Sequence, residues 1–207
     1  MWLPILVTVL VGYLLGNLNG AVSVSQMLND DVRQHGSGNA GLTNFIRNYG
    51  ASRSLLVILV DVSKTVLACL VGQLALQGFG YGQEGAMIGA VAVSLGHDFP
   101  ALLGFRGGKG ILSGFFVALT LDWRVALVIL GIFALAYFTT QYVSLGSVLG
   151  SIGFGVGFAF FYYDNLTVLL CGIFMAALAT FMHRENIKRL LRGQERKTNL
   201  FGKGSKQ

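Results

Sequence analysis

The stretch from Gly36 to Asn44 combines small residues with neutral polar side chains, and Arg47 follows it closely. Small residues leave backbone N–H groups accessible, and a run of such groups beside an arginine suits a phosphate. Asn44 and Arg47 would share a helix face because three positions separate them. The residues of this stretch that could bind a phosphorylated ligand are Ser37, Gly38, Asn39, Gly41, Thr43, Asn44 and Arg47. Composition alone supports a flexible polar loop equally well.

A second glycine-rich stretch surrounds Lys109 and follows the sequence Gly-His-Asp-Phe-Pro at positions 96–100. It differs from a nucleotide-binding Walker A loop, because Leu103 occupies the first glycine position and Gly110 replaces the Ser or Thr that holds magnesium. The pattern therefore disfavours nucleotide hydrolysis and favours anion binding by Lys109 and the neighbouring amides. The other candidate residues of this stretch are His97, Gly107, Gly108 and Gly110.

A third polar stretch, His183 to Ile187, ends the last apolar segment. His183 and Asn186 lie three positions apart and would share a helix face. A histidine at a membrane interface is either a base or a structural hydrogen-bonding residue, and both interpretations stay open. Ser147 begins another apolar segment, where its hydroxyl would either cap a helix or donate to a ligand.

Apolar segments must position these stretches, because 54% of the 207 residues are hydrophobic and only 12% are charged. Such segments run almost from end to end, which excludes a soluble domain with a single membrane anchor. A membrane-crossing helix needs about 20 mostly apolar residues. We predict an all-α, polytopic membrane protein of one domain over residues 1–207. The seven predicted spans are 3–22, 54–76, 85–103, 111–122, 125–143, 146–163 and 165–182.

The distribution of basic residues predicts the orientation of these spans. Seven crossings place segments 23–53, 104–110, 144–146 and 183–207 on one face, with 13 of the 15 Lys and Arg residues. The positive-inside rule makes this face cytoplasmic and the N-terminus external. It also explains the net charge of +6 without nucleic-acid binding. These residues are Arg33, Arg47, Arg53, Arg106, Lys109, Arg184, Lys188, Arg189, Arg192, Arg196, Lys197, Lys203 and Lys206.

Two charged residues, Asp61 and Lys64, lie three positions apart inside the second predicted span. Charges inside a membrane are costly when unpaired and often mark function. The two residues are therefore either an ion pair that stabilises the bundle or part of a transport pathway. After the last span, residues 183–193 carry apolar and basic residues at helical spacing, which predicts a short interfacial helix that ends at Gly193.

Taken together and in this order, the three polar stretches resemble the cytoplasmic motifs of the bacterial PlsY family, the acyl-phosphate:glycerol-3-phosphate acyltransferases. The resemblance covers the whole chain in length, span number, orientation and motif order. Three departures are visible: Gly16-Asn17-Leu18-Asn19 replaces Gly-Ser-Ile/Leu-Pro, Leu42 replaces a common Ala, and Arg106 replaces a common Lys.

The resemblance implies transfer of a fatty acyl group from acyl phosphate to the sn-1 hydroxyl of glycerol 3-phosphate. The products would be lysophosphatidic acid and phosphate, formed at the cytoplasmic face of the bacterial inner membrane. It implies catalytic roles for Ser37, Arg47, Lys109, His183 and Asn186, with the other candidates above, Ser147 included, binding substrate. Glu185, Asp61 and Lys64 would be structural, as would Asp98 as a partner of nearby basic residues. We expect no metal, cofactor or nucleic acid, and the sequence is compatible with a monomer.

Acyl phosphate is a mixed anhydride and already activated, so the hydroxyl needs no acyl-enzyme intermediate. The proton acceptor is either the phosphate of the donor or a histidine, His183 or His97. The absence of a His-x4-Asp acyltransferase motif favours the phosphate. One alternative function is a transporter of a phosphorylated anion, with Asp61 and Lys64 along its pathway. A lipid-binding scaffold is another, but it leaves the polar loops without a purpose.

Overall fold

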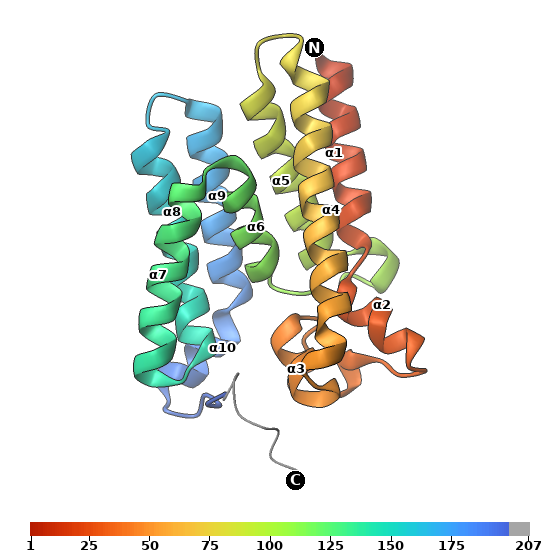
Figure 1. The fold of residues 1–207 in the computed structure, drawn as a ribbon, viewed down its shortest axis with the longest axis vertical. Helices are drawn as coiled ribbons and strands as arrows, with labels where there is room; N and C mark the ends of the chain where they lie inside the picture. Colours follow the sequence, from red (N-terminus) through yellow and green to blue (C-terminus); the bar gives the residue numbers. More distant parts are fainter. Residues whose placement is uncertain (199–207) are drawn as a thin grey trace. The chain divides into compact units, whose positions relative to one another are not determined.

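The computed structural model describes residues 1–198, and within them all regular structure is helical (Figure 1). Lys203 and Lys206, which we counted for the orientation, lie outside the described residues. The chain forms two compact units, Met1–Leu121 and Asp122–Gln207. The expected single domain over residues 1–207 stays a prediction.

Unit 1 begins with a broken helix. α1 (Trp2–Asn17) and α2 (Gly20–Met27) bend by 40° around Leu18 and Asn19. The span predicted at 3–22 is therefore a bent pair of helices and not one continuous helix, and its single crossing of the membrane stays a prediction. The break has a local cause, because the Asn19 side chain accepts a hydrogen bond from the Val22 N–H at 3.0 Å and starts a new helix there.

The rest of unit 1 consists of two long helices and several short ones. The long helices are α4 (Ala51–Gln77) and α5 (Gly82–Asp98). The short ones are η1 (Val32–Gln34), α3 (Leu42–Tyr49), η2 (Ala101–Leu103) and α6 (Ile111–Leu121).

Glycines let α1, α4 and α5 pack closely side by side (Figure 1). A Cβ on Gly72 of α4 would overlap the Gly85 carbonyl of α5, and a Cβ on Gly16 of α1 would overlap Val93 and Gly96 of α5. Backbone contact of this kind is typical of membrane helices. In lipid the hydrophobic effect does not drive helices together, and small residues allow the close van der Waals packing that does.

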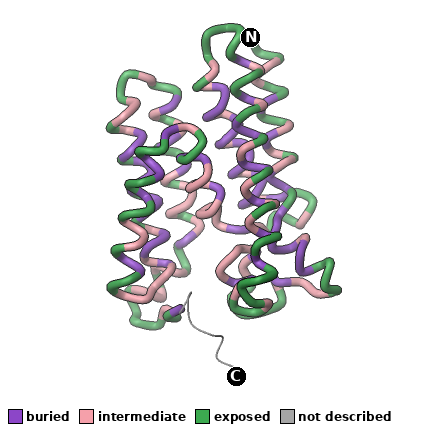
Figure 2. The backbone as a smooth tube through the Cα atoms, in the orientation of Figure 1, coloured by how far each residue is buried: buried purple, intermediate pink, exposed green. Residues whose placement is uncertain are grey.

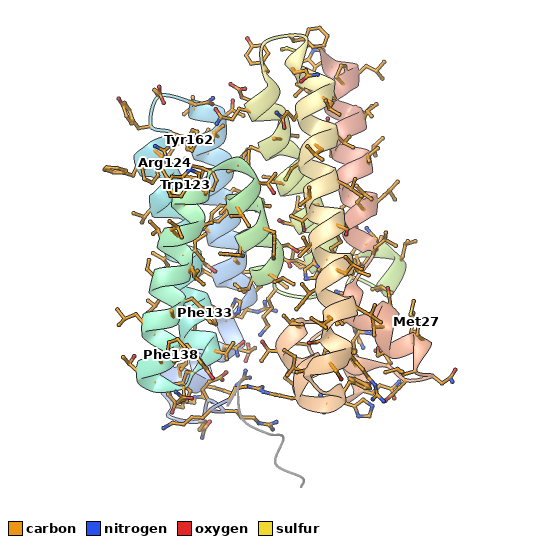
Figure 3. All side chains as sticks on the ribbon, in the orientation of Figure 1. Met27, Trp123, Arg124, Phe133, Phe138 and Tyr162 are labelled. Carbon is orange, nitrogen blue, oxygen red and sulfur yellow. The ribbon has the colours of Figure 1, made fainter. Side chains whose placement is uncertain are left out.

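Unit 2 contains α7 (Trp123–Thr140), α8 (Val143–Phe161), α9 (Leu166–Met182) and α10 (Arg184–Leu191). Figure 3 shows Arg124, at the start of α7, beside Tyr162, at the end of α8. Arg124 Nη2 lies 2.6 Å from Asp122 Oδ2, and the Tyr162 hydroxyl donates to the same oxygen at 3.0 Å. These contacts hold the two helix ends together. α10 and Gly193, with φ of +66°, confirm the short helix predicted after the last span.

Within residues 1–198, four helical segments are long and apolar enough to cross a membrane: Ala51–Gln77, Gly82–Leu103, Trp123–Thr140 and Val143–Phe161. The bent pairs α1–α2 and α9–α10 raise this number to six if each counts as one span. α6 has 11 residues, about half of what the hydrocarbon core requires. Whether it makes a seventh crossing stays a prediction.

The surface agrees with a lipid environment. Large apolar side chains are exposed along the outer faces of the helices, among them Leu55, Leu59, Leu74, Leu135 and Phe160. Figure 2 shows exposed and buried positions alternating along the long helices, as expected for helices with one packed face and one face toward lipid. The chain is thus a helical membrane protein by composition, length and surface.

The contact between α4 and α5 predicts a difference between two glycine-to-alanine variants. Gly72→Ala should lower the free energy of unfolding by about 1–3 kcal/mol, because the added methyl group meets backbone that cannot move aside. Gly131→Ala in α7 is the matched control, since nothing lies within 4 Å of its Cβ position. Thermal unfolding of both variants in detergent measures the effect. Equal melting temperatures would contradict the proposed close contact.

Candidate phosphate-binding site

Asn44 organises the loop that carries Ser37. Its side-chain oxygen accepts from the Ser37 N–H at 3.0 Å, and its amide nitrogen donates to the carbonyls of Val32, His35 and Asn39 at 3.0–3.1 Å. Asn44 is 2% exposed, so it supports the loop from beneath. Ser37 itself is exposed above it.

The turns of this loop are shaped by glycines at Gly36 and Gly38, with φ of +59° and +70°. Gly41 is the N-cap of α3 and Thr43 lies half-buried in its first turn. Arg47 is exposed in the last turn of α3, whereas Asn44 is buried. Of the two side chains predicted to share a helix face, Asn44 is therefore packed inside unit 1 and Arg47 lies at its surface.

A carboxylate fixes the outer edge of the same loop. Asp30 accepts from the Tyr49 hydroxyl at 2.8 Å and lies 2.9 Å from His35 Nε2. These two hydrogen bonds hold the pKa of Asp30 below its usual value. Burial and the neighbouring Asp30 raise the pKa of Tyr49 to about 12, so the phenol remains a donor at neutral pH.

Hydrogen bonds connect the Ser37 loop and η1, the short helix just before it, to other parts of unit 1. Asn19 Nδ2 donates to the Ala40 carbonyl at 3.0 Å, and Arg33 Nη1 donates to the Leu103 carbonyl at 3.1 Å. Arg33 is itself held by Asp31, 2.8 Å away. Through these contacts the loop is fixed to the α1–α2 break and to η2, which precedes the second glycine-rich stretch.

The second stretch lies directly against the end of α5. The Gly108 N–H donates to the His97 carbonyl at 3.0 Å. A Cβ on Gly107 would overlap that carbonyl, and a Cβ on Gly108 would overlap His97 Nε2 and lie 3.0 Å from the Ala40 carbonyl. The two glycine-rich stretches therefore meet at Gly108. Lys109 is partly exposed and Gly110 has φ of +68°.

A buried ion pair lies beneath this meeting point. Lys64 Nζ is 2.8 Å from Asp61 Oδ1 and donates to the carbonyls of Leu18 and Gly16 at 2.6 and 3.3 Å. Both charged side chains are about 2% exposed. The predicted pairing of Asp61 with Lys64 is confirmed.

Lys64 also contacts His97, whose Nδ1 lies 2.8 Å from Lys64 Nζ. An ammonium group only donates, so Nδ1 accepts and the ring proton resides on Nε2. His97 is 5% exposed and its Nε2 edge faces Gly108. The structure thus places His97 under the glycine-rich stretch as a support. The neighbouring Asp98 has a buried Oδ1 without a hydrogen bond in the described part of the chain, and its expected pairing with a basic residue stays a prediction.

In unit 2, His183 and Asn186 flank the junction of α9 and α10. His183 Nδ1 lies 2.8 Å from the Ala179 carbonyl, which can only accept, so Nδ1 carries the proton and Nε2 has the lone pair. Asn186 Nδ2 donates to Glu195 at 2.8 Å. Glu185 pairs with Lys188 at 2.9 Å on the surface, and its structural role stays a prediction.

Ser147 does not cap α8. The N-cap is Tyr142, and the Ser147 hydroxyl donates to the Val143 carbonyl at 2.9 Å within the helix. Of its two predicted roles, ligand binding is the one still open.

Sequence reasoning missed three residues that shape these regions: Asn19, Arg33 and Glu195. Asn19 belongs to the tetrapeptide in which the chain departs from the PlsY pattern, so a signal was present. Arg33 was counted only for its charge. Glu195 follows the predicted interfacial helix, and neither its type nor its position suggested a contact.

Comparisons with known proteins agree with this picture. A model of the glycerol-3-phosphate acyltransferase family matches residues 6–193. The chain belongs to this family. The predicted membership of the PlsY family is confirmed, and the protein is an integral membrane acyltransferase of that family.

Individual relatives match over nearly the whole chain. The glycerol-3-phosphate acyltransferase of Thermoanaerobacter sp. (strain X514) is 40% identical, over 92% of this chain and 93% of its own. That of Clostridioides difficile (strain 630) is 39% identical over 93% and 94%. The crystal structure of PlsY in its glycerol 3-phosphate form is similar with a TM-score of 0.83 and 32% identity, covering 96% of this chain and 99% of PlsY. The lysophosphatidic acid form gives a TM-score of 0.80 and 31% identity, over 94% and 95%.

The Lys64 cluster predicts a strong effect of removing the lysine alone. Lys64→Met should lower the free energy of unfolding by about 3–5 kcal/mol, because it leaves the Asp61 carboxylate buried without its counter-charge. The double variant Lys64→Met with Asp61→Asn removes both charges and should be less destabilised than Lys64→Met. A double-mutant cycle from melting curves in detergent measures this. Additive losses would show that the two side chains do not interact.

Proposed function

We propose that the protein transfers a fatty acyl group from acyl phosphate to the sn-1 hydroxyl of glycerol 3-phosphate. The products are lysophosphatidic acid and inorganic phosphate, and the reaction begins phospholipid synthesis. Family membership and the PlsY forms with glycerol 3-phosphate and lysophosphatidic acid support the substrate and the product.

The observation that carries the proposal is the meeting of the two glycine-rich stretches at Gly108. Each stretch offers backbone amides together with a polar or cationic side chain, Ser37 in one and Lys109 in the other. Small residues and a cation are what a phosphate group needs. We assign Ser37 and the surrounding amides, those of Gly38 and Asn39 included, to the acyl phosphate. Lys109 and Arg47 neutralise the phosphate of glycerol 3-phosphate.

Unit 2 contains neutral hydrogen-bond donors and an acceptor that suit glycerol 3-phosphate. We assign Ser147, His183 and Asn186 to glycerol 3-phosphate. His183 presents Nε2 as an acceptor because its Nδ1 proton is directed at Ala179. A hydroxyl of the substrate can donate to such a nitrogen, which would orient it for attack.

The chemistry needs no covalent intermediate. The sn-1 oxygen of glycerol 3-phosphate attacks the acyl carbonyl carbon, the bond from that carbon to the phosphate oxygen breaks, and the phosphate leaves with the electron pair. The hydroxyl proton passes to the departing phosphate. Backbone amides and cations that hold this phosphate stabilise the charge that it gains.

We further propose seven crossings with the N-terminus outside and the active site facing the cytoplasm. α6 is counted as the seventh crossing. In support, four exposed or partly exposed basic residues, Arg33, Arg47, Arg106 and Lys109, belong to the loops and short helices of unit 1 that carry the candidate site, and exposed Arg53 lies in the first turn of α4 next to them. The bacterial cytoplasmic membrane is the corresponding location. We keep the monomer as the proposed working unit.

The transporter alternative has less support. It expected Asp61 and Lys64 along a pathway, but both are buried and occupied by each other, by His97 and by backbone carbonyls. Charged residues on a transport path must be accessible to the transported ion. This pair instead has the surroundings of a structural contact.

The activity is tested with purified protein in detergent, acyl phosphate, glycerol 3-phosphate and detection of released phosphate. Phosphate release should require both substrates. Lys109→Ala should lower kcat/KM for glycerol 3-phosphate about 10²–10³-fold through loss of a charge-assisted contact. Lys188→Ala, which removes an exposed lysine paired with Glu185, should stay near wild type. No release with either acyl phosphate or acyl-CoA would reject the proposed function.

The proton acceptor is tested with His183→Asn and His97→Asn. Asparagine keeps a polar atom near the Nδ1 position, so each variant should fold, but neither can accept a proton at neutral pH. We expect both variants to keep measurable turnover at saturating substrate, because the phosphate of the donor takes the proton; in His183→Asn turnover should fall, because the contact that orients the hydroxyl is lost. If one variant bound both substrates normally and lost turnover, that histidine would be the base.

A further inference from the structure

The segment after α10 folds back over unit 2. The chain reverses at Gly193, and the Gln194 N–H donates to the Arg189 carbonyl at 2.8 Å. Farther on, the Thr198 N–H donates to the Gln141 carbonyl and the Tyr137 hydroxyl donates to the Thr198 carbonyl, both at 3.0 Å. Residues 194–198 are therefore held at both ends.

Glu195 lies between these two anchors, and its side chain is 7% exposed. Oε1 accepts from Asn186 Nδ2 at 2.8 Å, and Oε2 accepts from Arg189 Nε at 2.7 Å. Burial raises the pKa of Glu195, but the hydrogen bonds from Asn186 and Arg189, the nearby Ser144 hydroxyl and the charge of Arg189 together outweigh it, so the pKa lies below its usual value. The carboxylate is thus ionised and bound at neutral pH.

The partners of Glu195 are the groups that bind phosphate. An arginine and a neutral amide donor, placed to reach two oxygens of one anion, suit a phosphate group as well as a carboxylate. Asn186 is one of the residues assigned above to glycerol 3-phosphate. The Asn186 amide nitrogen has two N–H groups and one of them is bound to Glu195, so a phosphate that takes this N–H together with Arg189 Nε must displace the carboxylate.

We propose that Asn186 and Arg189 form an anion site that Glu195 fills in the free protein and that the phosphate of glycerol 3-phosphate takes over by displacing it. Glu195 is then an internal competitor of the substrate, and Arg189 is a further substrate-binding residue. This inference rests on the proposed function, because it identifies the displacing anion as the acyl acceptor. It adds the event that must precede binding: release of residues 194–198 from α10.

Glu195 could instead position Asn186 for catalysis, and the two roles predict opposite effects. A competitor weakens substrate binding, so its removal lowers KM for glycerol 3-phosphate and leaves kcat unchanged. A positioning residue supports turnover, so its removal lowers kcat.

The decisive variant is Glu195→Gln, which keeps the size of the side chain and removes its charge. In the phosphate-release assay with the full chain, KM for glycerol 3-phosphate should fall about tenfold while kcat stays within about twofold, because charge-assisted hydrogen bonds are lost. Glu185→Gln is the matched control: it neutralises a carboxylate of α10 whose ion pair is with exposed Lys188, and KM should stay near that of wild type. An unchanged or higher KM in Glu195→Gln would overturn the inference.

A binding measurement separates this inference from the proposed function. Inorganic phosphate should raise the melting temperature of Glu195→Gln more than that of wild type, since the site no longer contains its own anion. This holds even if the wild type shows no acyl transfer, a result that would reject only the activity. Equal shifts in the two proteins would overturn the internal competition.

Discussion

A cation inside the hydrophobic part of a membrane protein must find all its partners within the chain. Lys64 finds them on α1, at the α1–α2 break, on α4 and on α5. Its ammonium group donates to the carbonyls of Gly16 and Leu18, which lack helical partners because of the break. It also contacts the Asp61 carboxylate and His97 Nδ1. The helix break leaves the Gly16 and Leu18 carbonyls without helical partners, and the buried Lys64 ammonium group needs acceptors. Each therefore satisfies the hydrogen bonding of the other.

The candidate site of unit 1 follows from this arrangement. Asn19, just after the break, holds the Ala40 carbonyl, and His97 holds Gly108 through its own carbonyl. Both glycine-rich stretches are therefore attached to elements that Lys64 fixes. Rigid attachment matters because amides that must meet a phosphate gain most when they are already in place. The glycines at 107 and 108 are required by space, as any Cβ there would overlap His97.

The sequence predicts much of the fold, because apolar length and charge asymmetry are local properties. Six of the predicted spans lie within a few residues of observed helices, and the Asp61–Lys64 pair follows from i, i+3 spacing. The break at Leu18 was missed because the apolar content of residues 3–22 was taken as a whole, although polar Asn17 and Asn19 flank the break. His97 lies 33 positions from Lys64, so no spacing rule connects them. Asn44 is a residue type that often binds ligands, yet its side chain bonds to the backbone of its own loop. The sequence does not distinguish a ligand-binding asparagine from a supporting one, because the difference depends on the folded backbone.

An internal carboxylate at the Asn186–Arg189 site also bears on selectivity. A basic site near a membrane is surrounded by lipid phosphodiesters with one negative charge each. Glu195 competes from within the chain, at a high effective concentration, and an anion of equal charge gains little by replacing it. A phosphate monoester such as glycerol 3-phosphate has close to two charges at neutral pH and three terminal oxygens, so it interacts more strongly with Arg189. Any anion must therefore bind Asn186 and Arg189 more strongly than Glu195 does. By this argument the phosphate monoester displaces Glu195 and the lipid phosphodiester does not.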